Sequence, residues 1–240
     1  MNPLRALLRL AGRDLVRVEP GQPRSSLDLA ARRGITLVLD VGANTGQFAR
    51  RLRRGGYKGR IVCFEPVAET FRRLEQRMRG DAGVTAVQAA LGAVAGEASI
   101  HLAADPETAS MLASSPRLLD AAPGSRNVGT QAVRVETLDG VLSRWQQPGD
   151  RIFLKVDTQG YEQAVLDGAR ASLPGIDMVQ LELSLVPLYE GAPSLRSMLA
   201  RMEALGFEPA WFEPVFTDPS TGQLLQVDVA FLRPSPSEPR

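Results

Sequence analysis

Two hydrophobic patterns alternate along this chain: nearly continuous apolar runs, and stretches with one apolar stripe at helical spacing. Apolar runs occupy residues 35–41, 60–65, 84–88, 151–157 and 177–183. Helical spacing follows in residues 47–54 and 67–79, and again later in 161–171 and 194–205. Continuous apolar runs are typical of strands buried on both faces of a parallel sheet. The alternation therefore predicts a doubly wound α/β domain with right-handed crossovers.

The C-terminal part of the pattern predicts a hairpin. Two β-like segments, 207–212 and 224–232, flank the turn sequence Asp218-Pro219-Ser220-Thr221-Gly222. A short turn of this composition usually joins antiparallel strands. We therefore expect the last strand of the sheet to run against its neighbours.

One segment breaks the alternation. Residues 104–130 are rich in Ser, Pro, Ala and Gly, and lie between two expected extra strands at 97–102 and 131–136. A long insertion of this kind is usually a functional lid or a disordered loop, and Ser110 and Met111 are candidates for lid contacts. We divide the chain into an N-terminal helical extension (1–34), a single domain (35–233) and a frayed tail (234–240).

The first 17 residues read as a basic amphipathic helix. Arg5, Arg9 and Arg13 interrupt the apolar core that a signal peptide would need, and no run approaches the twenty apolar residues of a membrane span. The helix could make a weak contact with an anionic membrane surface, or simply cover an edge of the domain. Without an export signal, we expect the protein in the cytoplasm.

Charge and rare residues exclude several classes of function. The chain has 28 basic and 27 acidic side chains, a balance that argues against a dedicated nucleic-acid partner. The arginine-rich segment 50–60 is either a surface for an anionic partner or the solvated face of a helix. A single cysteine, Cys63, excludes an internal disulfide and a zinc cluster. The single histidine, His101, is either an ordinary strand residue or a general base.

Polar residues gather where the predicted strands end. Ligands of open α/β sheets bind at the carboxyl ends of the strands. The residues expected at those ends are Asp40, Asn44, Glu65, Gln88, Asp157 and Glu182. Several acids on one rim are hard to explain by packing alone, so this rim is the expected site.

The turn after the first strand indicates the kind of ligand. Gly42 and Gly46 allow a close approach of the backbone, but the turn is neither Gly-x-Gly-x-x-Gly nor a P-loop, so a pyrophosphate is not its obvious partner. Glu65 ends the second strand, where an acid of nucleotide-binding folds accepts hydrogen bonds from ribose. An adenosine-containing cofactor without a phosphate cradle fits, and S-adenosylmethionine is such a cofactor.

A series of motifs runs through residues 35–233. The motifs are Asp40-Val41-Gly42-Ala43-Asn44-Thr45-Gly46-Gln47-Phe48, Phe64-Glu65-Pro66, Ala90-Leu91-Gly92, Thr137-Leu138-Asp139, Leu154-Lys155-Val156-Asp157-Thr158-Gln159-Gly160-Tyr161-Glu162, Gln180-Leu181-Glu182-Leu183-Ser184 and Asp228-Val229-Ala230-Phe231. In this order they resemble the FkbM family of S-adenosylmethionine-dependent methyltransferases. Thr158 departs from the family pattern, which commonly has a hydrophobic residue there.

The resemblance implies a class I methyltransferase fold, with a Rossmann-like seven-stranded sheet whose last strand is antiparallel. It also implies methyl transfer to a hydroxyl group of a sugar, a glycan or a related small metabolite. The resemblance implies that the methionine end of the cofactor contacts Asp40, Gly42, Asn44, Thr45 and Gly46. It implies Glu65 with Pro66 for the ribose, and Ala90 and Leu91 for the adenine. Asp157 would face the sulfonium and the acceptor.

The acceptor hydroxyl must lose a proton during the transfer. We expect Asp157, helped by Lys155 or Glu182, to orient or deprotonate it. In a second version, Asp157 and Glu182 hold Mg²⁺, but two acids make a sparse metal site, and the version without a metal is preferred. Tyr161, Glu162 and Tyr189 are candidates to line the acceptor pocket, and the two tyrosines could instead be packing residues at its rim. Lys155 could instead serve only to pair with a nearby acid.

Two other classes of function compete with this interpretation. A nicotinamide-dependent oxidoreductase could use a similar sheet, but Asn44 stands where its fingerprint would have a glycine. A non-catalytic cofactor-binding scaffold is the second alternative. The sequence carries no signal for a particular acceptor or oligomeric state.

Overall fold

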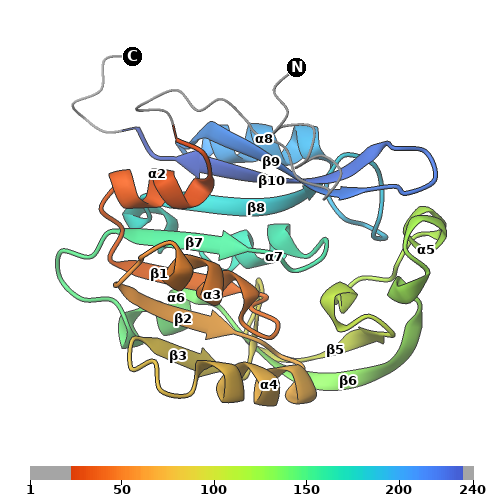
Figure 1. Cartoon of the computed structure of the whole chain (residues 1–240), viewed down its shortest axis with the longest axis horizontal. Helices are drawn as coiled ribbons and strands as arrows, with labels where there is room; N and C mark the ends of the chain where they lie inside the picture. The colour runs from red at the N-terminus through yellow and green to blue at the C-terminus, as the bar shows by residue number, and fades with distance from the viewer. Residues whose placement is uncertain (1–22, 235–240) are drawn as a thin grey trace, which may run out of the picture.

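A seven-stranded sheet forms the centre of the molecule, as the apolar runs predict (Figure 1). The computed structural model describes residues 23–234. Strand order is β3-β2-β1-β7-β8-β10-β9, so the chain builds outward from β1 first to one side and later to the other. The strands are β1 (Leu37–Val41), β2 (Arg60–Phe64), β3 (Val84–Val87), β7 (Ile152–Val156), β8 (Met178–Ser184), β9 (Glu208–Thr217) and β10 (Leu224–Leu232).

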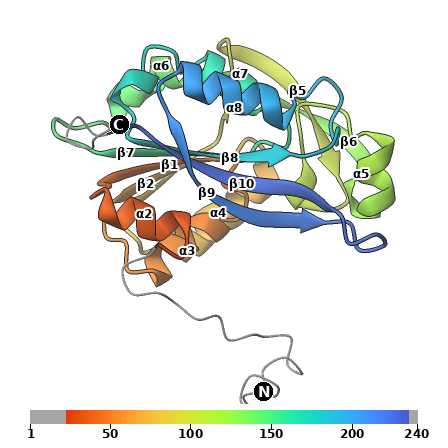
Figure 2. The ribbon, with the colours of Figure 1, turned by 90° about the horizontal axis from the view of Figure 1, so that it is seen from above.

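Helices cover both faces of this sheet (Figure 2). One face carries α2 (Ser26–Arg32), α3 (Gln47–Arg54) and α4 (Ala68–Met78), and the other carries α6 (Leu138–Val141), α7 (Glu162–Asp167) and α8 (Leu195–Ala204). Successive strand residues point to opposite faces, so β1 contributes Val38 to one core and Leu39 to the other. Short 3₁₀ turns, Leu142–Arg144 and Leu173–Gly175, complete the second layer.

The predicted hairpin is present, and β10 is antiparallel to both of its neighbours, β8 and β9. The antiparallel direction has a consequence for the site. It brings the start of β10 to the same edge as the end of β8, with Gln226 opposite Ser184.

A second, three-stranded sheet flanks the first, with the order β4-β6-β5. It contains β4 (Ala90–Leu91), β5 (Gly96–Ala103) and β6 (Asn127–Glu136), and β5 and β6 are the two extra strands that the sequence predicts. The insertion between them forms η1 (Pro106–Thr108), α5 (Pro116–Ala121) and η2 (Pro123–Ser125). Leu118 of α5 packs with Leu188 and Leu225, so this part of the insertion is tied to the main body.

Part of the arginine-rich segment forms ion pairs within the fold. Arg51 pairs with Glu213 at 3.0 Å and Arg53 pairs with Asp81 at 2.7 Å, both as N···O distances. The expected N-terminal amphipathic helix lies outside the described residues, as does the tail beyond residue 234. Among the helices of residues 23–234, none has the length and apolar character to cross a membrane.

Candidate functional site

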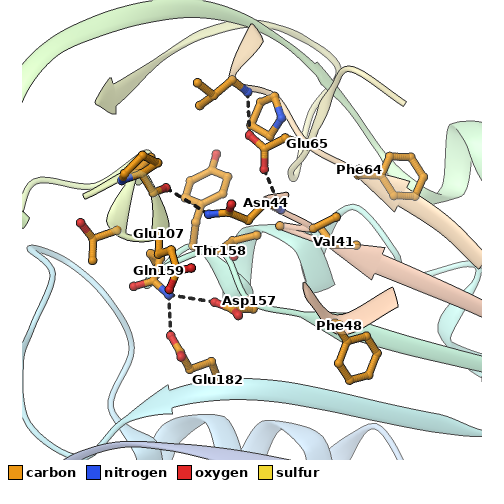
Figure 3. Close-up of a pocket in the computed structure, with 18 of the residues that line it drawn as sticks. Val41, Asn44, Phe48, Phe64, Glu65, Glu107, Asp157, Thr158, Gln159 and Glu182 are labelled. Atoms are coloured by element: carbon orange, nitrogen blue, oxygen red, sulfur yellow. Dashed lines mark hydrogen bonds between the residues drawn. The ribbon is translucent and has the colours of Figure 1, made fainter. Parts of the chain in front are cut away.

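A cavity of about 510 Å³ opens at the carboxyl ends of β1, β2, β7 and β8 (Figure 3). This is the edge where the strand order reverses between β1 and β7, the usual ligand site of such sheets. The predicted residues that line it are Gly42, Asn44, Glu65, Pro66, Ala90, Leu91, Lys155, Asp157 and Glu182, together with Tyr161 and Tyr189.

The turn after β1 packs tightly against the end of β7. Gly42 has φ +75°, and a Cβ atom there would lie 1.8 Å from the carbonyl oxygen of Asp157. Only glycine fits this position, since a side chain would meet both the left-handed backbone and a neighbouring peptide group. Asn44 also has a positive φ, +47°, and its side-chain Oδ1 accepts a hydrogen bond from Thr45 N at 2.6 Å.

Glu65 is buried, yet its carboxylate lines the cavity. Oε1 accepts a hydrogen bond from Val67 N at 2.8 Å, and Oε2 accepts one from Asn44 N at 3.0 Å (Figure 3). Burial raises the pKa of Glu65 to about 7, although these two backbone donors oppose the shift. An ionised carboxylate has about four acceptor positions, so each oxygen retains acceptor capacity for a ligand with two adjacent hydroxyls.

Three predicted cofactor residues, Asp40, Thr45 and Gly46, are not among those that line the cavity. Asp40 is fully buried, Thr45 accepts a hydrogen bond from Arg77, and Gly46 caps α3 with its Cα close to Leu74 and Met78. Because their contacts are with the protein interior, Asp40, Thr45 and Gly46 are placed to support the shape of the turn. Direct contact of these three with a cofactor stays a prediction from the family resemblance.

Apolar side chains form one end of the cavity. Ala90 and Leu91, which the sequence predicts, come from β4. Val67, Ile100 and Met111 join them from α4, β5 and the insertion, and the sequence did not single out Val67 or Ile100 for this wall. Such a surface accommodates a flat, weakly polar ring.

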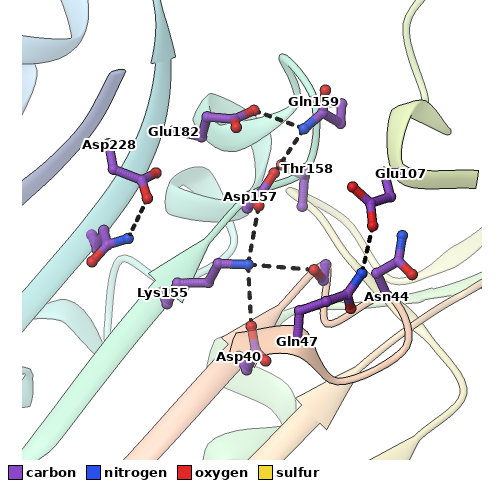
Figure 4. A network of polar contacts seen from close by, with 12 residues as sticks. Asp40, Asn44, Gln47, Glu107, Lys155, Asp157, Thr158, Gln159, Glu182 and Asp228 are labelled. Carbon is purple, nitrogen blue, oxygen red and sulfur yellow. Dashed lines mark hydrogen bonds and ion pairs between the residues drawn. The ribbon is translucent and has the colours of Figure 1, made fainter. Parts of the chain in front are cut away.

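Lys155 lies between two acids, which is the pairing that the sequence left as an alternative to a catalytic role (Figure 4). Its Nζ atom is 3.2 Å from Asp40 Oδ1 and 3.2 Å from Asp157 Oδ2, and it donates to the carbonyl oxygen of Gly42 at 3.4 Å. Burial lowers the pKa of Lys155, but the charges of Asp157 and Asp40 outweigh it and hold the pKa above its usual range. Lys155 is therefore a cation at neutral pH and cannot accept a proton.

The two acids expected to act on the acceptor share one amide. Gln159 Nε2 donates to Asp157 Oδ1 at 2.8 Å and to Glu182 Oε2 at 2.7 Å (Figures 3 and 4). Gln226 Nε2 donates to the same Glu182 oxygen at 2.8 Å. Burial, and then the charge of Asp157, raise the pKa of Glu182 well above its usual range. Asp157 differs from Glu182 in having a cation, Lys155, as its direct partner.

Other acids near this end have different surroundings. Asp228 of β10 lines the cavity, accepts a hydrogen bond from Gln180 Nε2 at 2.8 Å, and has its pKa raised to about 7 by burial. Glu162 does not line it: Oε1 instead accepts hydrogen bonds from Thr158 N at 2.9 Å and Gly160 N at 3.1 Å. Glu162 therefore holds the loop after β7. Asp228 was not predicted as a site residue, because the expected rim contained only residues at the carboxyl ends of strands, whereas Asp228 lies within the antiparallel strand β10, opposite Glu182.

The insertion lies over the cavity and contacts both sides of it. Asn44 Nδ2 donates to Pro106 O at 3.2 Å, and Gln47 Nε2 donates to Glu107 Oε1 at 2.7 Å. Ser110 Oγ donates to Gln159 O at 2.7 Å. Of the two predicted lid residues, Met111 lines the cavity and Ser110 anchors the loop beside it.

Two further predictions can be placed. His101 lies outside this cavity, on β5, with Nδ1 2.9 Å from Asn127 Nδ2, a position that suits a strand residue and not a general base. Within residues 23–234, no group of three or more His, Cys, Asp or Glu side chains is arranged to hold a metal ion. Gln88, the remaining residue of the expected rim, is exposed and outside the cavity wall.

Comparison with known proteins gives one family and a set of structural neighbours. The model of the methyltransferase FkbM domain matches residues 40–209. Comparison with curated protein sequences gives no match. Among solved structures, an uncharacterised protein from Listeria monocytogenes serotype 4b is 9% identical, with a TM-score of 0.50, over 91% of this chain and 71% of that chain.

Two other structural neighbours were solved with S-adenosylmethionine or its product bound. TrmK of M. capricolum, in complex with S-adenosyl-homocysteine, is 6% identical over 88% of this chain and 69% of its own, with a TM-score of 0.48. Magnesium protoporphyrin IX methyltransferase (ChlM) from Synechocystis PCC 6803, with bound SAM, is 11% identical over 87% of this chain and 75% of its own, with a TM-score of 0.47.

Proposed function

The chain belongs to the FkbM family of S-adenosylmethionine-dependent methyltransferases, and we propose that it transfers a methyl group from S-adenosylmethionine to a hydroxyl of a sugar, a glycan or a related small metabolite. Its strand order, with an antiparallel last strand, is that of the class I methyltransferase fold. The cavity at the carboxyl edge of the sheet is the site of both substrates.

Glu65 is the observation that carries the cofactor assignment. Its buried carboxylate faces the cavity and keeps acceptor capacity on both oxygens, and no cationic side chain of residues 23–234 is bonded to it. These features fit the vicinal diol of a ribose. The apolar wall of Val67, Ala90 and Leu91 next to it fits an adenine ring.

The charges in the cavity favour a cationic cofactor over a dinucleotide. Asp157, Glu182 and Asp228 line the wall, whereas the cations Lys155 and Arg51 are already paired with acids. A pyrophosphate would meet these acidic side chains, and neither cation of the described lining is free to balance its charge. A positively charged methyl donor meets a complementary surface, so the nicotinamide alternative is disfavoured.

When bound, S-adenosylmethionine supplies a methyl group activated by its positively charged sulfur. The protein is left with positioning and exclusion of water. Gly42 and Asn44 shape the turn that would hold the methionine end, Glu65 would hold the ribose, and the insertion covers the cavity through Pro106 and Glu107.

Asp157 is the proposed proton acceptor. Its side chain is 29% exposed, compared with 7% for Lys155, so its carboxylate reaches the cavity while the lysine stays behind it. The acceptor hydroxyl would give its proton to a carboxylate oxygen of Asp157 as the new bond to carbon forms. Lys155 would hold that carboxylate in place through their ion pair, and Glu182 would help to orient the acceptor.

We favour the version without a metal because of Gln159. Its Nε2 atom donates to both Asp157 and Glu182, and so occupies the position between the two carboxylates that a bridging ion would need. Turnover should therefore be unchanged when EDTA is added to the purified enzyme, and a loss that Mg²⁺ restores would favour the metal version.

The function is tested by transfer of radiolabelled methyl groups from S-adenosylmethionine. The acceptor panel contains free sugars, oligosaccharides, small polyols, total RNA and a cell extract. We expect label in a hydroxylated small molecule or glycan, and clearly less label with the Glu65→Ala variant at the same cofactor concentration. Label in RNA alone would contradict the proposed acceptor class, and binding of the cofactor without transfer to any acceptor would favour the scaffold alternative.

A further inference from the structure

Gln159 occupies a backbone conformation that a glutamine rarely adopts. Among residues 23–234, two non-glycine residues have a positive φ: Asn44 at +47° and Gln159 at +55°. Both line the cavity. Asparagine tolerates this region, but a residue with a longer side chain is disfavoured there. Such strain persists where the surrounding contacts determine it, and it clusters at functional sites.

The side-chain amide of Gln159 uses all of its hydrogen-bonding atoms. Both Nε2 hydrogens are donated, to Asp157 Oδ1 at 2.8 Å and to Glu182 Oε2 at 2.7 Å, and Oε1 accepts a hydrogen bond from Tyr189 OH. Because donors and acceptors match at every position, the network fixes which end of the amide is nitrogen. The backbone conformation of Gln159 therefore places its side-chain amide between the carboxylates of Asp157 and Glu182.

The Asp157 carboxylate is consequently held at both oxygens. Lys155 Nζ lies 3.2 Å from Oδ2, and Gln159 holds Oδ1 from the opposite side (Figure 4). Glu182, Glu162 and Asp228 are the other acids that act on this region, and Tyr189 packs beside it. The neutral amide of Gln159 donates one hydrogen bond to Asp157 and one to Glu182, and so holds these two neighbouring carboxylates in a fixed arrangement.

We propose that Gln159 is the positioning residue that fixes the Asp157 carboxylate toward the acceptor hydroxyl. The role of Asp157 in transfer rests on the proposed function, whereas the two hydrogen bonds from Gln159 Nε2 to Asp157 and Glu182 do not. Gln159 also connects the two acids to the insertion over the cavity, because its carbonyl oxygen accepts a hydrogen bond from Ser110 Oγ at 2.7 Å.

Three variants test this role. Gln159→Gly suits the positive φ and removes the amide. Gln159→Asn also suits the backbone and keeps an amide, but its side chain is one carbon shorter and cannot span the same two acids. Gln163→Ala is the control, because Gln163 is exposed on α7 and outside the cavity wall.

For each variant we would measure affinity for S-adenosyl-homocysteine by calorimetry, kcat and KM on the acceptor that the panel reveals, and a crystal structure of Gln159→Gly. We expect Gln159→Gly to lower kcat by roughly 30- to 100-fold, since misplacing a reacting group by about 1 Å can cost that much. The KM for S-adenosylmethionine and the affinity for S-adenosyl-homocysteine should change by less than about threefold. Gln159→Asn should recover part of the loss, and Gln163→Ala should match the wild type.

In the crystal structure of Gln159→Gly, the Asp157 and Glu182 carboxylates should have moved from their present positions. Unmoved carboxylates, or an unchanged kcat, would overturn the proposal. A merely structural role would instead lower cofactor affinity and kcat together. If the wild-type protein transfers to no acceptor, the proposed function fails, but the crystal structure still decides whether Gln159 holds the two acids.

Discussion

Two buried ionisable residues of the site, Glu65 and Lys155, illustrate different ways in which a charge is tolerated inside a protein. Lys155 has acids on two sides, so its charge is neutralised within the fold. Within the described part of the chain, Glu65 has only backbone donors on its oxygens, and burial raises its pKa to about 7. A buried acid without a cationic partner is a candidate for ligand binding, whereas a fully paired lysine is a candidate for structural support.

Glu65→Ala should weaken binding of S-adenosylmethionine. At pH 8, above the Glu65 pKa of about 7, the carboxylate is ionised. A hydrogen bond to a charged acceptor contributes about 1.5–3 kcal/mol, so loss of the carboxylate should lower affinity by roughly 10- to 100-fold in calorimetry at this pH. Glu69→Ala is the matched control, because Glu69 is exposed on α4 and pairs with Arg72 and Arg73. Equal affinity of the Glu65 variant and the control would contradict the ribose assignment.

Lys155→Met should destabilise the fold. The substitution leaves the fully buried Asp40 without its cation, and breaking a buried pair from one side costs about 3–5 kcal/mol in free energy of unfolding. Urea denaturation measures this loss. Lys58→Met provides the control at the other lysine of the chain, which is exposed, and should change the free energy by less than about 0.5 kcal/mol. Similar values for both variants would show that the buried pair is unimportant.

At the scale of elements, the site depends on how closely the turn after β1 approaches β7. A Cβ atom on Gly42 would lie 1.8 Å from the carbonyl oxygen of Asp157, and one on Gly168 would lie 2.0 Å from that of Gly92. Both glycines therefore set the distance between neighbouring elements. Gly168 is also the C-cap of α7, which ends at Asp167, before the expected limit of residue 171.

Gly42→Ala and Gly56→Ala separate backbone strain from this close approach. Both glycines have positive φ, +75° and +88°, but nothing lies within 4 Å of a Cβ atom on Gly56. Gly56→Ala should cost about 1–2 kcal/mol of stability, which is the penalty of the left-handed conformation. Gly42→Ala should cost clearly more and abolish cofactor binding, as chemical denaturation and calorimetry would measure. Equal costs with binding retained would show that the approach to β7 is not required.

The sequence predicted best those elements whose own pattern determines them. The apolar runs marked β1, β2 and β7, and α3 begins and ends at Gln47 and Arg54 as expected, between glycines. Because ligands bind at the carboxyl ends of parallel strands, the sequence also predicted that Glu65, Asp157 and Glu182 share one rim, and all three line the cavity. Other positions depend on packing between distant segments. The contact of Gln47 with Glu107 needs the insertion to fold over the rim, and Glu162 turns inward only because three donors of its own loop satisfy it.

Across the whole molecule, burial around one cavity makes folding stability depend on pH. The pKa values of Glu65, Glu162 and Asp228 are all raised to about 7, mainly by burial. In the unfolded chain these acids lose their protons near pH 4. Between pH 4 and 7 the folded state therefore binds more protons than the unfolded state, so stability falls as pH rises through this window.

We therefore expect the free energy of unfolding of the ligand-free protein to be higher at pH 5.5 than at pH 8. Each fully shifted group contributes a slope of about 1.4 kcal/mol per pH unit within its window, so the combined change should be several kcal/mol. Urea denaturation across this range measures it. Below about pH 4 the trend should reverse, because Asp81, Asp150 and Asp167 have lowered pKa values and lose their ion pairs there. A stability that is flat or rises from pH 5.5 to 8 would contradict the assignment of three buried, protonated acids.

The central claim is that this cavity holds the adenosine part of a methyl donor on Glu65. A crystal structure with S-adenosyl-homocysteine tests it most directly. We expect both ribose hydroxyls within hydrogen-bonding distance of the Glu65 carboxylate, the adenine beside Ala90 and Leu91, and the amino-acid end near Gly42. A ligand bound elsewhere, or a Glu65 carboxylate without contact to the ribose, would contradict the account.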